Sequence, residues 1–100
     1  MNVPDQWVVL EITTPKETIR KVLAGWRGGY LHGDSWRLNS GIVETKEFDN
    51  YWDFHGASGS VYRCRKDGYG MTTYMAQIYN SFLASLSDDM TMTVLEESNI

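Results

Sequence analysis

A β-strand with two apolar faces is predicted by the run Gln6-Trp7-Val8-Val9-Leu10-Glu11-Ile12-Thr13. Successive side chains of a strand point to opposite faces, so Val8, Leu10 and Ile12 form one face that is entirely apolar. The opposite face is apolar in part, because Glu11 follows Trp7 and Val9 on it. A strand of this kind belongs at the centre of a sheet, so residues 6–13 are expected to be a central strand.

The segment that follows fits two structures. Thr14-Pro15-Lys16-Glu17 matches a helix-capping box with proline at the first helical position, and the apolar residues up to Trp26 follow helical spacing. Residues 13–17 also fit a hairpin turn into a strand over 18–24, which the β-branched side chains there favour. On the strength of the capping signal we predict a short helix that stops at Gly25.

Further along the chain, turn signals separate short runs of strand character. Four glycines in Gly25–Ser35 predict a loop, because so much backbone freedom is incompatible with a regular element. Strand-like runs then cover residues 35–39, 42–48, 51–55 and 60–65, with turn residues between them. This succession predicts an antiparallel meander.

A helix over residues 72–86 is predicted by an apolar stripe at helical spacing. The stripe consists of Met75, Ile78, Tyr79, Phe82, Leu83 and Leu86. Alternation over Met90–Glu96 predicts a last strand. The expected architecture is one small α+β domain over residues 1–100, in which the helix packs on one face of an antiparallel sheet.

Composition narrows the classes of function. The net charge of −4 argues against nonspecific nucleic-acid binding, which depends on neutralising phosphates. No apolar run approaches the length of a membrane span, and no secretory signal opens the chain. The single cysteine, Cys64, cannot form an internal disulfide. We therefore expect a protein of the cytosol.

The glycine-rich segment is the candidate binding site. Its free backbone amides, cationic groups and aromatic faces suit an anionic or flat ligand, although no known phosphate-binding motif is matched. As a plain connection, the same segment would pack Trp26 and Tyr30 into the core. The candidate ligand-binding or partner-binding residues are Arg27, Tyr30, His32, Asp34, Ser35, Trp36, Arg37 and Arg63.

No catalytic residue, metal site or cofactor is predicted. Asp53 and His55 share a strand face, but no third partner is evident; Ser35 with His32 and Asp34 is equally incomplete. Cys64 lies between two arginines, yet neighbours on a strand point to opposite faces, so a buried thiol is the expectation. The two histidines and one cysteine lack metal-ligand spacing.

Two segments carry a resemblance to a known group of proteins. Gly33-Asp34-Ser35-Trp36-Arg37-Leu38-Asn39-Ser40-Gly41-Ile42 and Ser58-Gly59-Ser60-Val61-Tyr62-Arg63-Cys64 resemble small uncharacterised proteins encoded by tailed bacteriophages. The resemblance implies a phage origin and residence in the cytoplasm of an infected bacterium, and it implies no activity.

Two hypotheses of function follow. The first is a non-enzymatic binding module that inhibits or modulates a host or anti-phage defence protein, which the acidic C-terminal third and the aromatic residues favour. The alternative is a binder, or sponge, of a small anionic ligand such as a nucleotide. A homodimer would provide a pocket for that ligand at its subunit boundary.

Overall fold

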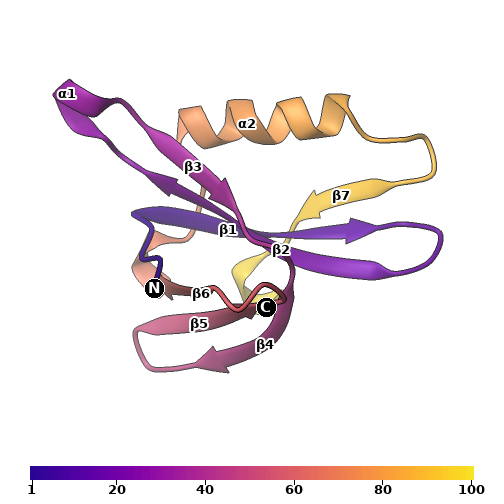
Figure 1. The fold of residues 1–100 in the computed structure, drawn as a ribbon, viewed down its shortest axis with the longest axis horizontal. Helices are drawn as coiled ribbons and strands as arrows, with labels where there is room; N and C mark the ends of the chain where they lie inside the picture. The colour runs from indigo at the N-terminus through magenta and orange to yellow at the C-terminus, as the bar shows by residue number, and fades with distance from the viewer.

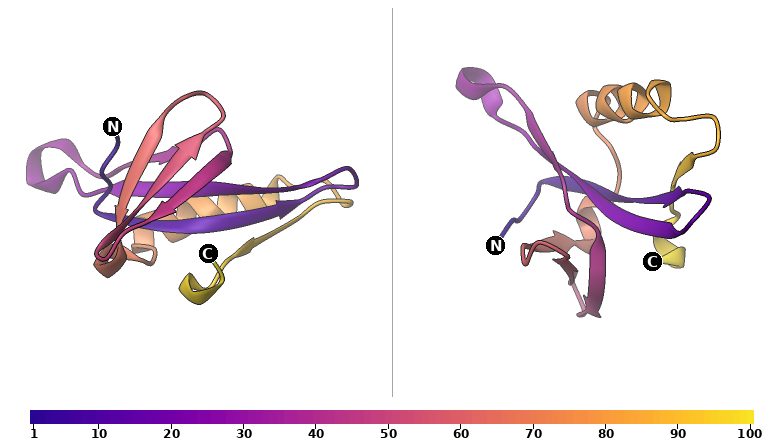
Figure 2. Two further views of the ribbon diagram at one scale, coloured as in Figure 1. Left: turned by 90° about the horizontal axis from the view of Figure 1, so that it is seen from below. Right: turned by 45° about the vertical axis from the view of Figure 1, so that its right-hand side comes forward.

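Two antiparallel β-sheets and one long helix form three layers in the computed structural model, which describes all 100 residues (Figure 1). Helix α2 (Thr73–Ala84) covers one face of a four-stranded sheet, and a three-stranded sheet covers the other face (Figure 2). The four-stranded sheet has the order β3-β2-β1-β7, with bounds Ser35–Leu38, Thr18–Trp26, Gln6–Thr13 and Thr91–Val94. The three-stranded sheet has the order β4-β5-β6, with bounds Ile42–Glu47, Tyr51–Gly56 and Val61–Arg65. The predicted α+β class is confirmed, but the strands form two sheets instead of one.

Strand β1 is central, as its sequence predicts. It pairs with β2 along its whole length and with β7 along its second half. Its two apolar faces are both used, because Trp7 and Val9 enter the core between the sheets while Val8 and Leu10 enter the core under α2. All four of these side chains are buried.

The predicted helix over residues 14–24 is wrong, and the alternative of a hairpin is correct. The hydroxyl of Thr14 accepts hydrogen bonds from the backbone N–H groups of Lys16 and Glu17, at 3.2 and 3.1 Å. A helix N-cap makes this same kind of bond, so the capping signal is satisfied by a tight turn instead. Residues 22–25 are then buried on both faces of β2, which only a central strand allows.

The chain changes sheets at Asn39. Strand β3 pairs with β2 as far as Leu38, and β4 begins the second sheet at Ile42. Asn39 continues the ladder with its side chain, because its Oδ1 accepts from the backbone N–H of Val22 at 2.7 Å while its own N–H donates to the Val22 carbonyl at 3.0 Å. Gly41 follows with a φ of 130°, which turns the chain away. The expected meander therefore covers β4, β5 and β6 but excludes β3.

The C-terminal third follows its sequence pattern closely. Thr72 caps α2 by accepting from the backbone N–H of Met75, and the apolar stripe packs on the four-stranded sheet. Leu83 is the exception within the predicted stripe, since it is 40% exposed. One-turn 3-10 helices occupy Lys66–Gly68 and Glu97–Asn99. None of the helices combines the length and apolar character needed to cross a membrane.

Two cores result from this layering. The core between the sheets contains Trp7, Val9, Val22, Ala24, Trp52, Phe54, Tyr62 and Cys64. The core between the four-stranded sheet and α2 contains Val8, Leu10, Leu23, Met75 and Met92.

Candidate functional site

The hairpin of β2 and β3 extends beyond the three layers and ends in the one-turn helix α1 (Gly29–His32), as Figures 1 and 2 show. Two apolar side chains lie at this tip in full contact with solvent: Tyr30 is 102% exposed and Leu31 is 81% exposed. Tyr30 therefore does not enter the core, contrary to its expected place in a plain connection. The predicted loop Gly25–Ser35 is also shorter than expected, because its ends belong to β2 and β3.

Glycines shape the tip. Gly29 and Gly33 have φ values of 66° and 67°, a region that other residues rarely adopt. Gly28 lies so close to the carbonyl of Gly33 that a Cβ atom would overlap it. Asp34 accepts from the N–H of Gly28 at 3.4 Å across the same turn. The tip is thus a closed turn that presents Tyr30 and Leu31 outward.

The base of the hairpin is tied to the N-terminal segment. The backbone N–H of Arg27 donates to Asp5 Oδ2 at 2.8 Å, and the Arg27 guanidinium hydrogen-bonds the side chain of Gln6. Trp26 is half-buried and its indole N–H donates to the carbonyl of Val3 at 3.0 Å. The tip therefore projects from an anchored base.

Strand β3 directs its predicted binding residues to two opposite faces. Trp36 lies against Phe82 of α2, with ring centroids 5.4 Å apart. Arg37 points to the other side and donates to Asn2 Oδ1 at 3.1 Å. Ser35 lies beside Arg37 in a small hollow of about 260 Å³. These residues consequently do not converge on one ligand.

Arg63 lies on another surface altogether, the outer face of the three-stranded sheet. Its guanidinium donates two hydrogen bonds to the carboxylate of Asp53, both 2.9 Å long, and stacks over the Tyr51 ring at 4.4 Å. The hydrogen bonds from Arg63 lower the pKa of Asp53 despite its burial, and the same bonds raise the pKa of Arg63. Arg63 is thus engaged in the packing of its own sheet.

Cys64 lies apart from the other candidate catalytic groups, although Asp53 and His55 remain neighbours on β5. Cys64 is fully buried in the core between the sheets, as predicted, whereas Asp53 lies on the outer face with its carboxylate held by Arg63. His32 lies in α1 at the hairpin tip, beyond the layers that contain β5 and β6 (Figure 1). The structure also contains no group of three or more His, Cys, Asp or Glu side chains that could hold a metal ion.

Alkylation of Cys64 is expected to be slow in the folded protein. Burial raises the pKa of its thiol far above the usual range, and the negative charge of Asp53 raises it further, so almost no thiolate forms near neutral pH. With iodoacetamide at pH 7.5, mass spectrometry should find little labelling in buffer and complete labelling in denaturant. Rapid labelling of the folded protein would contradict this placement.

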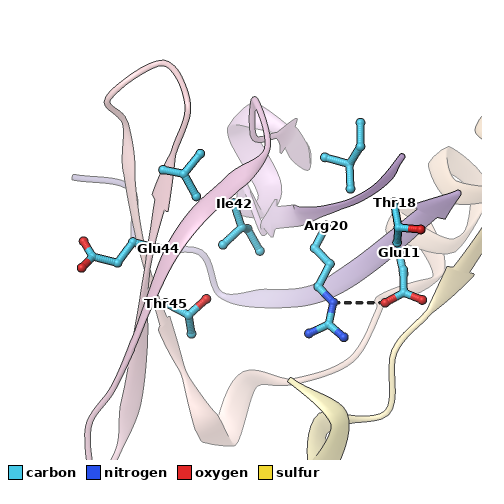
Figure 3. Close-up of a pocket in the computed structure, with 8 residues that line it drawn as sticks. Glu11, Thr18, Arg20, Ile42, Glu44 and Thr45 are labelled. Carbon is cyan, nitrogen blue, oxygen red and sulfur yellow. Dashed lines mark hydrogen bonds and ion pairs between the residues drawn. The ribbon is translucent and has the colours of Figure 1, made fainter. Parts of the chain in front are cut away.

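Three open hollows interrupt the surface. The largest, about 620 Å³, lies between the hairpin and the first turn of α2, and its lining includes Arg27 and Asp34. The hollow that contains Arg37 is the one of about 260 Å³, and a third of about 450 Å³ lies between the two sheets (Figure 3). The cationic side chains predicted to bind an anion are therefore divided among separate places.

Leu31 is the tip residue that sequence reasoning missed. A signal for it existed, because Leu31 is an apolar side chain inside a glycine-rich segment and belongs to no strand or helix pattern. Comparisons with protein-family models, with curated proteins and with solved structures found no match to this chain.

Proposed function

We propose that this protein is a non-enzymatic binding module whose β2–β3 hairpin tip inserts Tyr30 and Leu31 into an apolar pocket of a partner protein. The observation that carries the proposal is the exposure of these two adjacent side chains at the projecting end of the β2–β3 hairpin (Figure 1). Removal of exposed apolar groups from water by a partner lowers the free energy of the complex. Tyrosine is also among the residues most enriched in binding hot spots.

The arrangement of the tip favours binding without a large entropic cost. The closed turn of glycines and the anchored base limit the conformations that binding must freeze. His32 adjoins the apolar pair in α1, and Arg27 lies at the base of the hairpin, so polar groups border the apolar pair as they border the centre of protein interfaces. The partner that we propose is a host or anti-phage defence protein of the bacterium.

The sponge for an anionic ligand is the weaker proposal. It requires several cationic groups around one pocket, whereas Arg27 and Arg37 lie in different hollows and Arg63 is paired with Asp53. No observation on the structure favours that function over protein binding.

Capture from a bacterial lysate tests the leading proposal. The tagged protein should retain a specific protein that the double variant Tyr30→Ser/Leu31→Ser loses, and the affinity for that purified protein should fall about tenfold or more. Both substituted side chains are solvent-exposed, so circular dichroism should show an unchanged fold.

The matched control is Leu83→Ser, which removes an exposed leucine from α2. It should retain the captured protein at the level of the unmodified chain. Equal capture by the tip variant, or the absence of any specific protein, would contradict the proposed role of the tip.

A further inference from the structure

Strand β4 leaves the longest free edge of the molecule. It has six residues and pairs with β5 on one side only, through five of them with a bulge at Val43, whereas the other single-paired strands β3 and β7 have four residues each. The far edge of the same sheet, at β6, is covered by Asn2, which hydrogen-bonds Val61 and Arg63 through its backbone. A row of unpaired backbone groups is a template for another strand.

The inner face of β4 borders the third hollow (Figure 3). Residues 42–45 of β4 form one wall, and Glu11 with residues 18–20 of the β1–β2 hairpin form the other, around about 450 Å³. Ile42 and Thr45 point into this hollow and Glu44 points away from it (Figure 3), so the hollow borders the inner face of β4 and leaves the strand uncovered there.

The register of β4 identifies the backbone groups that face outward. Phe48 donates its N–H to the carbonyl of Tyr51 at 2.9 Å, so Phe48 points its backbone groups toward β5. Alternate residues of an antiparallel strand direct these groups to opposite edges, which leaves those of Glu47 and Thr45 on the free edge.

We propose that two copies of this chain pair antiparallel through β4, about a two-fold axis at Thr45, and form one six-stranded sheet. In this register the two Thr45 residues exchange backbone hydrogen bonds. Glu44 of each copy lies directly opposite Lys46 of the other copy, at the closer spacing of a pair that is not hydrogen-bonded.

Charge selects this register among the two-fold alternatives. Centring the axis on Glu44, Lys46 or Glu47 would place each of these residues opposite its own copy, with like charges in contact. Only the axis at Thr45 pairs the signs, and it does so twice by symmetry. A lysine on an edge strand usually discourages pairing with another strand. Here Lys46 of one copy lies opposite Glu44 of the other copy, so its charge is paired in the dimer.

Apolar side chains at the two ends of the strand agree with the same register. Val43 is 68% exposed and Phe48 is 41% exposed. Antiparallel pairing about Thr45 sets Phe48 of one copy opposite Ile42 of the second copy, beside Val43, which itself lies opposite Glu47. Each end of the paired strands then covers apolar surface that the single chain leaves in water.

Light scattering and analytical ultracentrifugation across a range of protein concentrations test the proposal. The unmodified chain should form a dimer, and Glu44→Lys or Lys46→Glu should each raise its dissociation constant about tenfold. An equimolar mixture of these two variants should form a heterodimer as stable as the original, because every Glu then faces a Lys. Thr45→Pro removes an N–H that β5 does not use and should also abolish the dimer.

The outcomes separate this inference from the proposed function. A monomer at millimolar concentration, or a dimer that none of these substitutions weakens, would overturn it. A monomer that loses its captured partner protein on Thr45→Pro would also overturn it, and would assign the edge to a strand of that partner. Tyr30→Ser/Leu31→Ser should leave the dimer intact. The dimer measurements therefore test the β4 proposal whether or not the hairpin tip binds a partner.

Discussion

Replacing Trp7 by alanine is expected to lower the free energy of unfolding by about 3–5 kcal/mol, a large part of the stability of a domain of this size. The Trp7 side chain is fully buried between the two sheets. Its ring contacts those of Phe54 and Tyr69, with centroids 5.5 and 4.7 Å away. Its indole N–H donates to the carbonyl of Arg65 at 2.7 Å, so the substitution leaves both a cavity and an unpaired carbonyl.

Denaturant unfolding followed by far-ultraviolet circular dichroism measures this loss. Trp36→Ala is the matched control, because Trp36 is 37% exposed and packs chiefly on Phe82, and its effect should be clearly smaller. Trp7→Phe should fall between the two, since it keeps most of the apolar volume and loses the hydrogen bond. A Trp7→Ala loss no greater than that of Trp36→Ala would contradict the central place of Trp7.

Replacing Asn39 by alanine should cost about 2–3 kcal/mol, an effect out of proportion to the size of the side chain. Asn39 is buried, and its Oδ1 is the acceptor for the backbone N–H of Val22, a residue with no exposed surface. Alanine leaves that N–H buried without a partner at the point where the chain passes between the sheets.

Asn50→Ala provides the same chemical change in an exposed turn, between β4 and β5. It should alter the free energy of unfolding by no more than about 0.5 kcal/mol. Urea titrations of both variants give the comparison directly. Equal losses of stability at the two positions would show that the side chain of Asn39 does not stabilise the segment that joins the two sheets.

The sequence predicted the local character of the candidate site but not the spatial arrangement of its residues. The glycines between Trp26 and Ser35 indicate an irregular segment, and the structure places a projecting turn there. The expectation that Arg63 shares a site with this segment fails, because strand pairing sets Arg63 opposite Asp53 on the far sheet. The local pattern of each segment does not show that β3 and β6 belong to different sheets.

Local alternation and helical spacing alone determined the central strand β1, the meander of β4 to β6, helix α2 and the burial of Cys64, because these features depend on residues close together in the chain. Only the tertiary structure decided that residues 18–26 form a strand, since Thr14 would cap a helix or close a turn equally well, and the partners on both sides of β2 select the strand. It alone decided the division into two sheets at Asn39, the exposure of Tyr30 and Leu31, and the free edge of β4. Each of these depends on contacts between segments far apart in sequence, or on their absence, and such contacts exist only once the chain has folded.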